Sequence, residues 1–233
     1  MRALGLDPSL RSYGWCVYDS LAEGKEKRVA SGHEATLPST VPEARFIHFR
    51  ALVRDLLRRW RVDVVGLESP AYGGGAYSET HFGLMMYSRE AVFESRTDLV
   101  LFDPTTLKYL TGKSDASKSD MQRFVQLQTM DPDPLQADEA DAFCAAHFAV
   151  RFMKVRSGEL DPDAISRQER RVFLQRTKTV KTIRGKRRRR TAHAFRENSR
   201  FFQFSKVPEG STDLPDKDLV EPGLLAWLED QDP

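Results

Sequence analysis

The alternation of apolar and polar residues predicts strands within the first hundred or so residues. Three of them are expected to form an antiparallel meander and two follow later, at 2–7, 12–19, 27–37, 62–68 and 98–103. Apolar residues elsewhere recur at three- and four-residue spacing, which predicts helices at 43–60, 78–95, 104–110, 117–130 and 137–155. The strand at 62–68 is entered from a helix, so it should run parallel to the first strand. The pattern predicts an α/β fold with a mixed five-stranded sheet flanked by helices.

The pattern changes beyond residue 156. A linker at 157–166 leads to a short predicted helix at 167–174, and the stretch 177–205 shows strand-like alternation interrupted at Gly185. We interpret that stretch as a small basic β-meander, and the acidic, proline-containing end of the chain as loose. The expected organisation is an α/β domain at 1–155, a β-rich appendage at 156–210 and a tail at 211–233.

Length and composition restrict the class of protein. A chain of 233 residues with 40% hydrophobic content can bury the core of one good-sized domain with an appendage. Its apolar stretches are shorter than the roughly 18 residues of a membrane span, and a charged residue follows Met1 directly. Cys16 and Cys144 offer no CxxC or CxxH pairing and are expected to be buried spectators. We therefore expect a soluble, cytoplasmic protein with no membrane partner.

The net charge of +2 conceals a strong asymmetry. There are 17 basic and 21 acidic residues up to position 150, 18 and 6 from 151 to 210, and 1 and 7 after that. The basic middle part indicates a polyanionic partner, and nucleic acid is the first candidate.

Four carboxylates are placed where they could meet. Asp7 and Glu68 end two predicted parallel strands, whose carboxyl ends lie at the same edge of a sheet. Asp138 and Asp141 lie about one turn apart on one face of the helix at 137–155. Converging acids repel one another unless divalent cations lie among them, and oxygen ligands suit Mg²⁺ or Mn²⁺. Two such ions can activate a water and stabilise the leaving oxygen of a phosphodiester.

Most of these acids also have an ordinary explanation. Asp7 precedes a proline, as turn residues often do, and Asp138 with Asp141 matches the acidic first turn of a helix. Glu68 is harder to explain in this way, because an acid that closes an apolar strand is usually paired or functional. The joint arrangement favours the functional interpretation.

Four motifs in chain order resemble the RuvC family of Holliday-junction resolvases. They are the opening "LGLDPSLRSYGW", then "GLESP", then "DPTTLKYLTGKSDASKSD", and last the helix "ADEADAFCAAH". The resemblance extends over residues 1 to about 153. Ser9 stands where the family favours glycine, and the segment between Lys108 and Gly112 is one residue shorter.

The resemblance implies a ribonuclease H-like fold and an Mg²⁺-dependent endodeoxyribonuclease of DNA recombination and repair. Its catalytic, metal-binding acids would be Asp7, Glu68, Asp138 and Asp141, with two Mg²⁺ ions per site and Mn²⁺ as a substitute. The substrate would be branched DNA, a four-way junction nicked symmetrically by a homodimer. The apolar helix at 78–95 is a candidate for the dimer interface, with core packing as the alternative.

The resemblance also suggests DNA contacts. Lys108 and Lys118 match basic residues that the family uses near the scissile phosphate and the DNA backbone, although spacing alone is typical of surface lysines. Arg11, in the first turn, is a further candidate. Tyr72, or Tyr77 as second choice, matches the aromatic that family members wedge into the junction, and a loop tyrosine packed on one side is the alternative.

Beyond the family motifs, charge alone indicates DNA binding. The candidate residues are Lys181, Arg184, Lys186, Arg187, Arg188, Arg189 and Arg190. A nuclear localisation signal or a solvated charge run would also explain them. Because several phenylalanines follow closely, we favour a folded module that grips duplex arms, and such an extra region is compatible with a phage or mobile-element origin.

Other functions remain open at this stage. Another ribonuclease H-like nuclease could act on branched DNA, an RNA–DNA hybrid or a transposition intermediate. An actin-like ATPase would need a second copy of the fold, for which the chain is short. A DNA-binding protein without catalysis would have no use for four mutually repelling acids.

Overall fold

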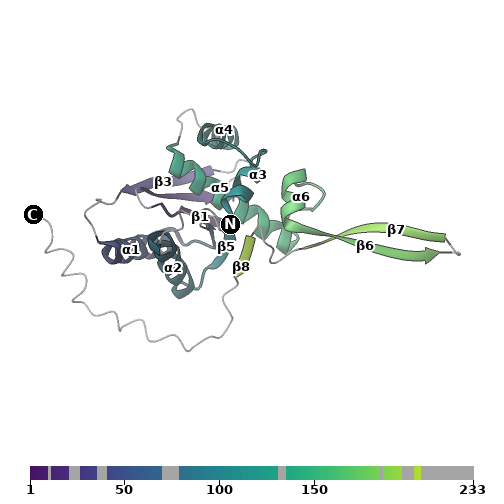
Figure 1. The fold of residues 1–233 in the computed structure, drawn as a ribbon, viewed down its shortest axis with the longest axis horizontal. Coiled ribbons are helices and arrows are strands. Elements are labelled where there is room, and N and C mark those ends of the chain that lie inside the picture. Colours follow the sequence, from purple (N-terminus) through teal and green to yellow (C-terminus); the bar gives the residue numbers. More distant parts are fainter. Residues whose placement is uncertain are drawn as a thin grey trace, which may run out of the picture.

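The computed structural model describes residues 1–9, 12–20, 27–35, 41–69, 79–130, 135–183, 186–195 and 202–205 (Figure 1). The elements of the first part of the chain are β1 (Arg2–Asp7), β2 (Ser12–Asp19), β3 (Lys27–Ala35), α1 (Pro42–Trp60), β4 (Val64–Glu68), α2 (Glu79–Glu94) and β5 (Asp98–Phe102). The later elements are α3 (Pro104–Leu110), α4 (Lys118–Thr129), α5 (Ala137–Ser157), α6 (Arg167–Phe173), β6 (Leu174–Ile183), β7 (Lys186–Phe195) and β8 (Phe202–Ser205). The acidic tail at 211–233 lies outside the described residues.

The predicted mixed sheet is confirmed and has the strand order β3-β2-β1-β4-β5-β8. The meander β1–β2–β3 is antiparallel, whereas β4 runs parallel to both β1 and β5. The five predicted strands are all present, and β8 extends the sheet by pairing antiparallel with β5. The carboxyl ends of β1, β4 and β5 therefore share one edge of the sheet.

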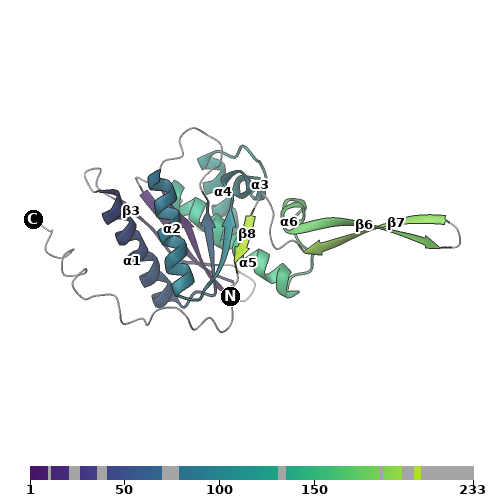
Figure 2. The ribbon, with the colours of Figure 1, turned by 60° about the horizontal axis from the view of Figure 1, so that its bottom comes forward.

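Two layers of helices cover the sheet, because its strands are apolar on both faces (Figures 1 and 2). One face packs against α5, and the other against the pair α1 and α2. Successive residues of a strand alternate between the two cores; in β1, Ala3 belongs to the α5 side and Leu4 to the α1 and α2 side.

Helix α5 lies unusually close to the sheet. A Cβ added at Gly5 would overlap the backbone of Ala142, and one added at Gly66 would overlap that of Ala145. Alanines on the helix and glycines at the middle of β1 and β4 thus permit backbone contact. A third glycine, Gly14 of β2, lies directly under the backbone of Asp138. The first turn of α5 is thereby fixed at the sheet edge where β1 ends.

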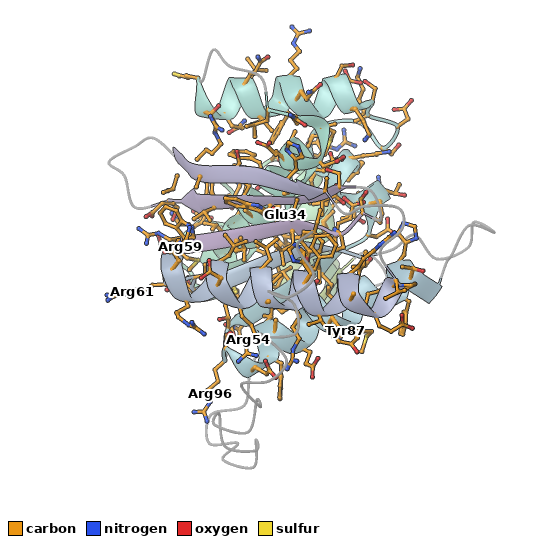
Figure 3. The ribbon with its side chains drawn as sticks, turned by 90° about the vertical axis from the view of Figure 1, so that its left-hand side faces the viewer. Glu34, Arg54, Arg59, Arg61, Tyr87 and Arg96 are labelled. Carbon is orange, nitrogen blue, oxygen red and sulfur yellow. The ribbon has the colours of Figure 1, made fainter. Side chains whose placement is uncertain are left out.

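The opposite edge of the parallel strands carries basic residues. Arg61 ends α1 just before β4, and Arg96 follows α2 just before β5; both have positive φ, of 48° and 53°. Both side chains project outward, while Arg54 and Arg59 lie along α1 (Figure 3). Since β4 and β5 are parallel, Arg61 and Arg96 are at the amino edge, away from the carboxylates that end β1 and β4.

The β-rich appendage differs from the predicted meander. Strands β6 and β7 form a separate two-stranded antiparallel sheet, a long hairpin that projects from the body of the molecule (Figures 1 and 2). The third strand, β8, instead pairs with β5 in the main sheet. The single-meander prediction is therefore wrong, because β5 has an open edge that β8 can satisfy with backbone hydrogen bonds.

Helix α6 connects the hairpin to the body and packs on it. Arg151 of α5 forms a bidentate ion pair with Glu169 of α6, whose side chain is 4% exposed. Phe152 and Phe173 meet edge to face, with ring centroids 5.6 Å apart. Among the described residues, no helix is long and apolar enough to cross a membrane.

Candidate active site

The four predicted acids come from three elements that meet at the carboxyl edge of the sheet. Asp7 and Glu68 are the last residues of β1 and β4, whose register pairs Leu6 with Leu67 immediately before them. Asp138 lies in the first turn of α5, and Asp141 one turn further on. All four side chains are partly buried. The structure thus brings together acids that are up to 134 positions apart, from 7 to 141.

The carboxylates influence one another strongly. Burial, followed by the charges of Asp141 and Asp138, raises the pKa of Asp7 well above its ordinary value. Burial, followed by the charges of Asp7 and Asp141, likewise raises the pKa of Glu68. The pKa of Asp141 is raised to about 6, chiefly by burial. The cluster of four carboxylates therefore has a surplus of negative charge that a bound cation would neutralise.

Both predicted lysines act on this group. Lys118 begins α4, which Ser117 and Asp120 fix with a reciprocal capping box. Its Nζ donates a hydrogen bond to Oδ1 of Asp138 at 3.3 Å, and the charge of Asp138 raises the pKa of Lys118. Lys108 is exposed on α3, and its charge acts to lower the pKa values of Glu68 and Asp141.

The donor set suits a hard divalent cation, but the side chains are not arranged around one. Within the described part of the chain, no three or more Asp, Glu, His or Cys side chains are spaced to hold one metal ion. Lys118 instead supplies positive charge at Asp138. Carboxylate oxygens whose pKa values are raised by burial and then by neighbouring negative charges fit Mg²⁺ or Mn²⁺, and side-chain rotations would be needed to bring them onto an ion.

A fifth acid, Asp103, lies at the same edge. It follows β5, and its charge is one of those that raise the pKa of Glu68. Its Oδ1 accepts hydrogen bonds from the backbone N–H groups of Thr105 and Thr106, at 2.8 and 3.2 Å, and so caps α3. The sequence carried the same signal for Asp103 as for Asp7 and Glu68, namely an acid directly after an apolar strand.

Glu139, between the two predicted ligands of α5, is directed elsewhere. Its Oε2 accepts a hydrogen bond from Oγ of Ser31 at 2.7 Å, and its Oε1 lies 3.2 Å from Nδ1 of His33. Glu139 therefore ties α5 to β3 and makes a suitable control for Asp138.

Several predicted DNA contacts are not described at side-chain level. Arg11, Tyr72, Tyr77 and Arg184 lie outside the described residues. For the hairpin residues the structure gives backbone and register: Lys181 is opposite Arg188, and Ile183 is opposite Lys186. The assignments of Arg187, Arg189 and Arg190 to DNA binding likewise stay predictions.

Known proteins resemble this chain over about two thirds of its length. No family model matches the sequence. Crossover junction endodeoxyribonuclease RuvC of Prochlorococcus marinus (strain MIT 9303) is 26% identical over 152 residues, which cover 63% of this chain and 96% of that protein. The Rickettsia bellii (strain RML369-C) protein of the same name is 26% identical over 153 residues, 63% of this chain and 95% of its own. The resemblance to the RuvC family is confirmed.

The solved RuvC structures confirm the fold. Thermus thermophilus RuvC superimposes with a TM-score of 0.58 at 21% identity, covering 68% of this chain and 97% of its own. The structure of T. thermophilus RuvC in complex with a Holliday junction substrate gives 0.57 at the same identity, covering 68% and 96%. Nearly the whole length of these relatives is thus matched by about two thirds of this chain, and the remaining third is additional to the RuvC fold.

Proposed function

We propose that this protein is a divalent-metal-dependent endodeoxyribonuclease that resolves four-way DNA junctions by paired symmetric nicks. The observation that carries the proposal is the convergence of Asp7, Glu68, Asp138 and Asp141 at one sheet edge. Burial and neighbouring negative charges raise the pKa values of Asp7, Glu68 and Asp141 there. The RuvC resemblance supports the same reaction and the same substrate. A role in DNA recombination and repair, and a cytoplasmic location beside the DNA, follow as predictions.

The four acids would hold the metal ions, and the two lysines would hold the DNA. Two Mg²⁺ ions at such a site, or Mn²⁺ in their place, supply an activated water and a Lewis acid for the leaving oxygen. Asp7 and Glu68 end adjacent paired strands, so their backbones are held side by side while their carboxylates can turn toward an ion. Lys118 and Lys108 stand on separate helices and are exposed, which suits them to contact phosphates on either side of the cut.

The β6–β7 hairpin would extend the DNA contact along a duplex arm. Ten residues per strand at about 3.3 Å each span about 33 Å, close to one turn of B-DNA. The register pairs Lys181 with Arg188, Thr179 with Arg190, Thr182 with Arg187 and Val180 with Arg189. Basic residues recur along the hairpin in this way, which suits it to neutralise phosphates along a duplex arm.

Symmetric nicking requires two active sites, which a two-fold homodimer provides. Helix α2 carries three exposed large apolar residues, Phe82, Met86 and Phe93, with exposed fractions of 44%, 40% and 44%. They are spaced four and seven positions apart and so share one side of the helix. That apolar stripe, on the outer face of the α1 and α2 layer, supports α2 as the dimer interface.

Cleavage of defined substrates tests the proposal. The purified protein with Mg²⁺ should introduce paired symmetric nicks into a labelled four-way junction and leave linear duplex intact. Glu68→Gln should abolish the nicks, whereas Glu139→Gln, which neutralises an acid next to Asp138 on the same helix, should retain them. Cleavage of an RNA–DNA hybrid alone would assign the protein to the ribonucleases H, and full activity of Glu68→Gln would disprove the metal site.

A further inference from the structure

A pocket of about 400 Å³ opens beside the candidate active site. It lies between α3, the segment that follows α3, and α6, and its lining includes Asp103, Thr105, Tyr109, Ser114, Arg171 and Val172. Its volume is within the range of small-ligand sites. The lining combines a carboxylate, hydroxyl groups, an aromatic ring and a guanidinium, which is a polar recognition surface with one apolar wall.

Asp103 connects this pocket to the catalytic acids. Asp103 directly follows β5, and the register pairs Phe102, the residue before it, with Glu68 at the end of β4. Both hydrogen bonds that cap α3 go to Oδ1 of Asp103, and in the described part of the chain no partner is found for Oδ2. An acceptor in the pocket is thus available next to the place where the DNA strand would be cut.

Tyr109 and Arg171 form the opposite part of the pocket. Nη1 of Arg171 lies 3.4 Å from the Tyr109 hydroxyl, and the guanidinium carbon is 5.5 Å from the centre of the ring. Arg171 is exposed and Tyr109 is partly exposed, so both can be reached from solvent. A tyrosine ring and a guanidinium are the two groups on which proteins stack unpaired bases.

The wall formed by α6 lies beyond the last of the motifs that resemble RuvC. Arg171 and Val172 follow the residues that match the RuvC motifs, and the buried ion pair between Arg151 and Glu169 fixes their helix against α5. The RuvC relatives are matched almost in full by about 63% of this chain. The pocket therefore combines residues of a RuvC-like motif with residues that follow the last of those motifs.

We propose that this pocket binds a single unpaired nucleotide of the DNA strand that passes through the active site. The base would lie against the ring of Tyr109, with an amino group of the base donating to Asp103, and Arg171 would contact the adjoining phosphate. A crossover can supply such a nucleotide, because bases at a branch point are unstacked at lower cost than bases within a duplex. The inference rests on the proposed function, since it assigns a position to the junction strand.

The test compares intact junctions with junctions that lack one base. A set of four-way junctions is prepared in which each nucleotide around the crossover is replaced in turn by an abasic residue. Binding is measured in Mg²⁺ with the full chain carrying Glu68→Gln, so that the DNA stays uncut. At one position, loss of the base should weaken binding at least about fivefold. This factor corresponds to the smallest stacking free energy between a base and an aromatic side chain.

Pocket variants then show where that base binds. In Tyr109→Leu the intact junction should bind as weakly as the abasic one, so the difference in affinity between the two junctions disappears. Tyr109→Phe should restore that difference. Arg171→Gln should weaken binding to both junctions, whereas Arg167→Gln, at the exposed start of the same helix, should leave both unchanged.

Three results would overturn the inference. A base penalty that persists in Tyr109→Leu would place the base elsewhere. Junction binding with no penalty at any position would show that no base is read. Binding of free nucleoside monophosphates that is lost in Tyr109→Leu, without any abasic effect, would make the ligand a free nucleotide. In each of these results the protein still binds the junction. If the proposed function itself were wrong, selective junction binding and cleavage would be absent, so the two failures can be told apart.

Discussion

Lys118 donates a hydrogen bond from Nζ to Oδ1 of Asp138 across 3.3 Å, and so joins the start of α4 to the start of α5. The lysine side chain is 70% exposed, while that of Asp138 is 22% exposed. This exposed ammonium already neutralises part of the charge at the cluster of acids.

Replacing Lys118 should therefore impair catalysis more than folding. We expect Lys118→Gln to lower kcat/KM for junction cleavage by about 10²-fold, because one preorganised positive charge near the scissile phosphate is removed. Single-turnover cleavage and a thermal melt of the same preparation measure the two effects. Lys154→Gln, near the far end of α5, is the control and should cleave normally. Equal loss in both variants would show that Lys118 contributes only general charge.

Divalent metal should stabilise the folded protein even without DNA. The charges of Asp7, Glu68 and Asp141 repel one another in a partly buried site, and a bound ion relieves this cost. Titration with Mg²⁺ should raise Tm by about 2–4 °C for each 1 kcal/mol gained. Glu68→Gln should melt at higher temperature than the wild type in EDTA and gain less from Mg²⁺. The same Mg²⁺-induced shift in both proteins would exclude Glu68 as a ligand.

The ion pair between α5 and α6 should make stability depend on pH. Burial acts to raise the pKa of Glu169, but the hydrogen bonds and charge of Arg151, together with Ser166, outweigh it and lower that pKa. The stabilisation is therefore complete above the unfolded value of about 4.3 and is lost as the pH falls through the lower folded value. Near neutral pH, Glu169→Gln should cost about 3 kcal/mol, since it leaves Arg151 without its partner.

Urea unfolding at several pH values tests this dependence. The difference in unfolding free energy between wild type and Glu169→Gln should be constant from pH 7 to about 5 and should shrink below about pH 4. Glu159→Gln is a suitable control, because Glu159 is 58% exposed in its pair with Lys154 and should contribute little. A difference that stays constant down to pH 3 would contradict the lowered pKa.

The apolar stripe on α2 predicts how the dimer can be broken. Met86→Lys places a charge in the centre of the proposed interface and should convert the dimer to a monomer with an unchanged helical signal. Sedimentation measures the assembly state, and the paired nicks should become uncoupled single nicks. Leu127→Lys, at a 69% exposed position on α4, is the matched control and should remain dimeric. A dimeric Met86→Lys variant would place the interface elsewhere.

The parts of the fold that the sequence predicts are those encoded by short-range patterns. Alternation and helical spacing predicted β1, β4 and α5, and their termini brought Asp7, Glu68 and Asp138 to one edge. Asp103 was overlooked, although it follows its strand directly, because its place before a helix also explains it as a cap.

Long-range pairing was beyond these patterns. Val100 of β5 pairs with Phe204 of β8, and no local signal distinguishes that pairing from a continued meander. Tyr109 and Arg171 are 62 positions apart. They meet because α6 packs on the body through the ion pair of Glu169 and the contact of Phe173 with Phe152. Partner choice for an open sheet edge or a helix face depends on the assembled body, so both features required the structure.

This topology also determines how the basic hairpin should be tested. Removing everything after 156 would delete β8 from the main sheet and α6 from the core, so a loss of binding could reflect misfolding. Replacing only residues 177–193 with a short Gly-Ser link should preserve the fold, because the hairpin is a separate sheet. Binding to a four-way junction should then weaken. The slope of log affinity against log salt concentration should become shallower by about 0.9 for each phosphate that the protein no longer neutralises.

A matched variant separates charge from shape in that experiment. Replacing the basic residues of 186–190 with glutamine should keep the hairpin while reducing the salt slope nearly as much as the deletion does. Glutamine variants of Arg61 and Arg96, at the opposite edge of the sheet, should leave affinity and slope unchanged. If the hairpin deletion gives the wild-type affinity across the whole salt series, the hairpin does not bind DNA and its charge must serve another partner.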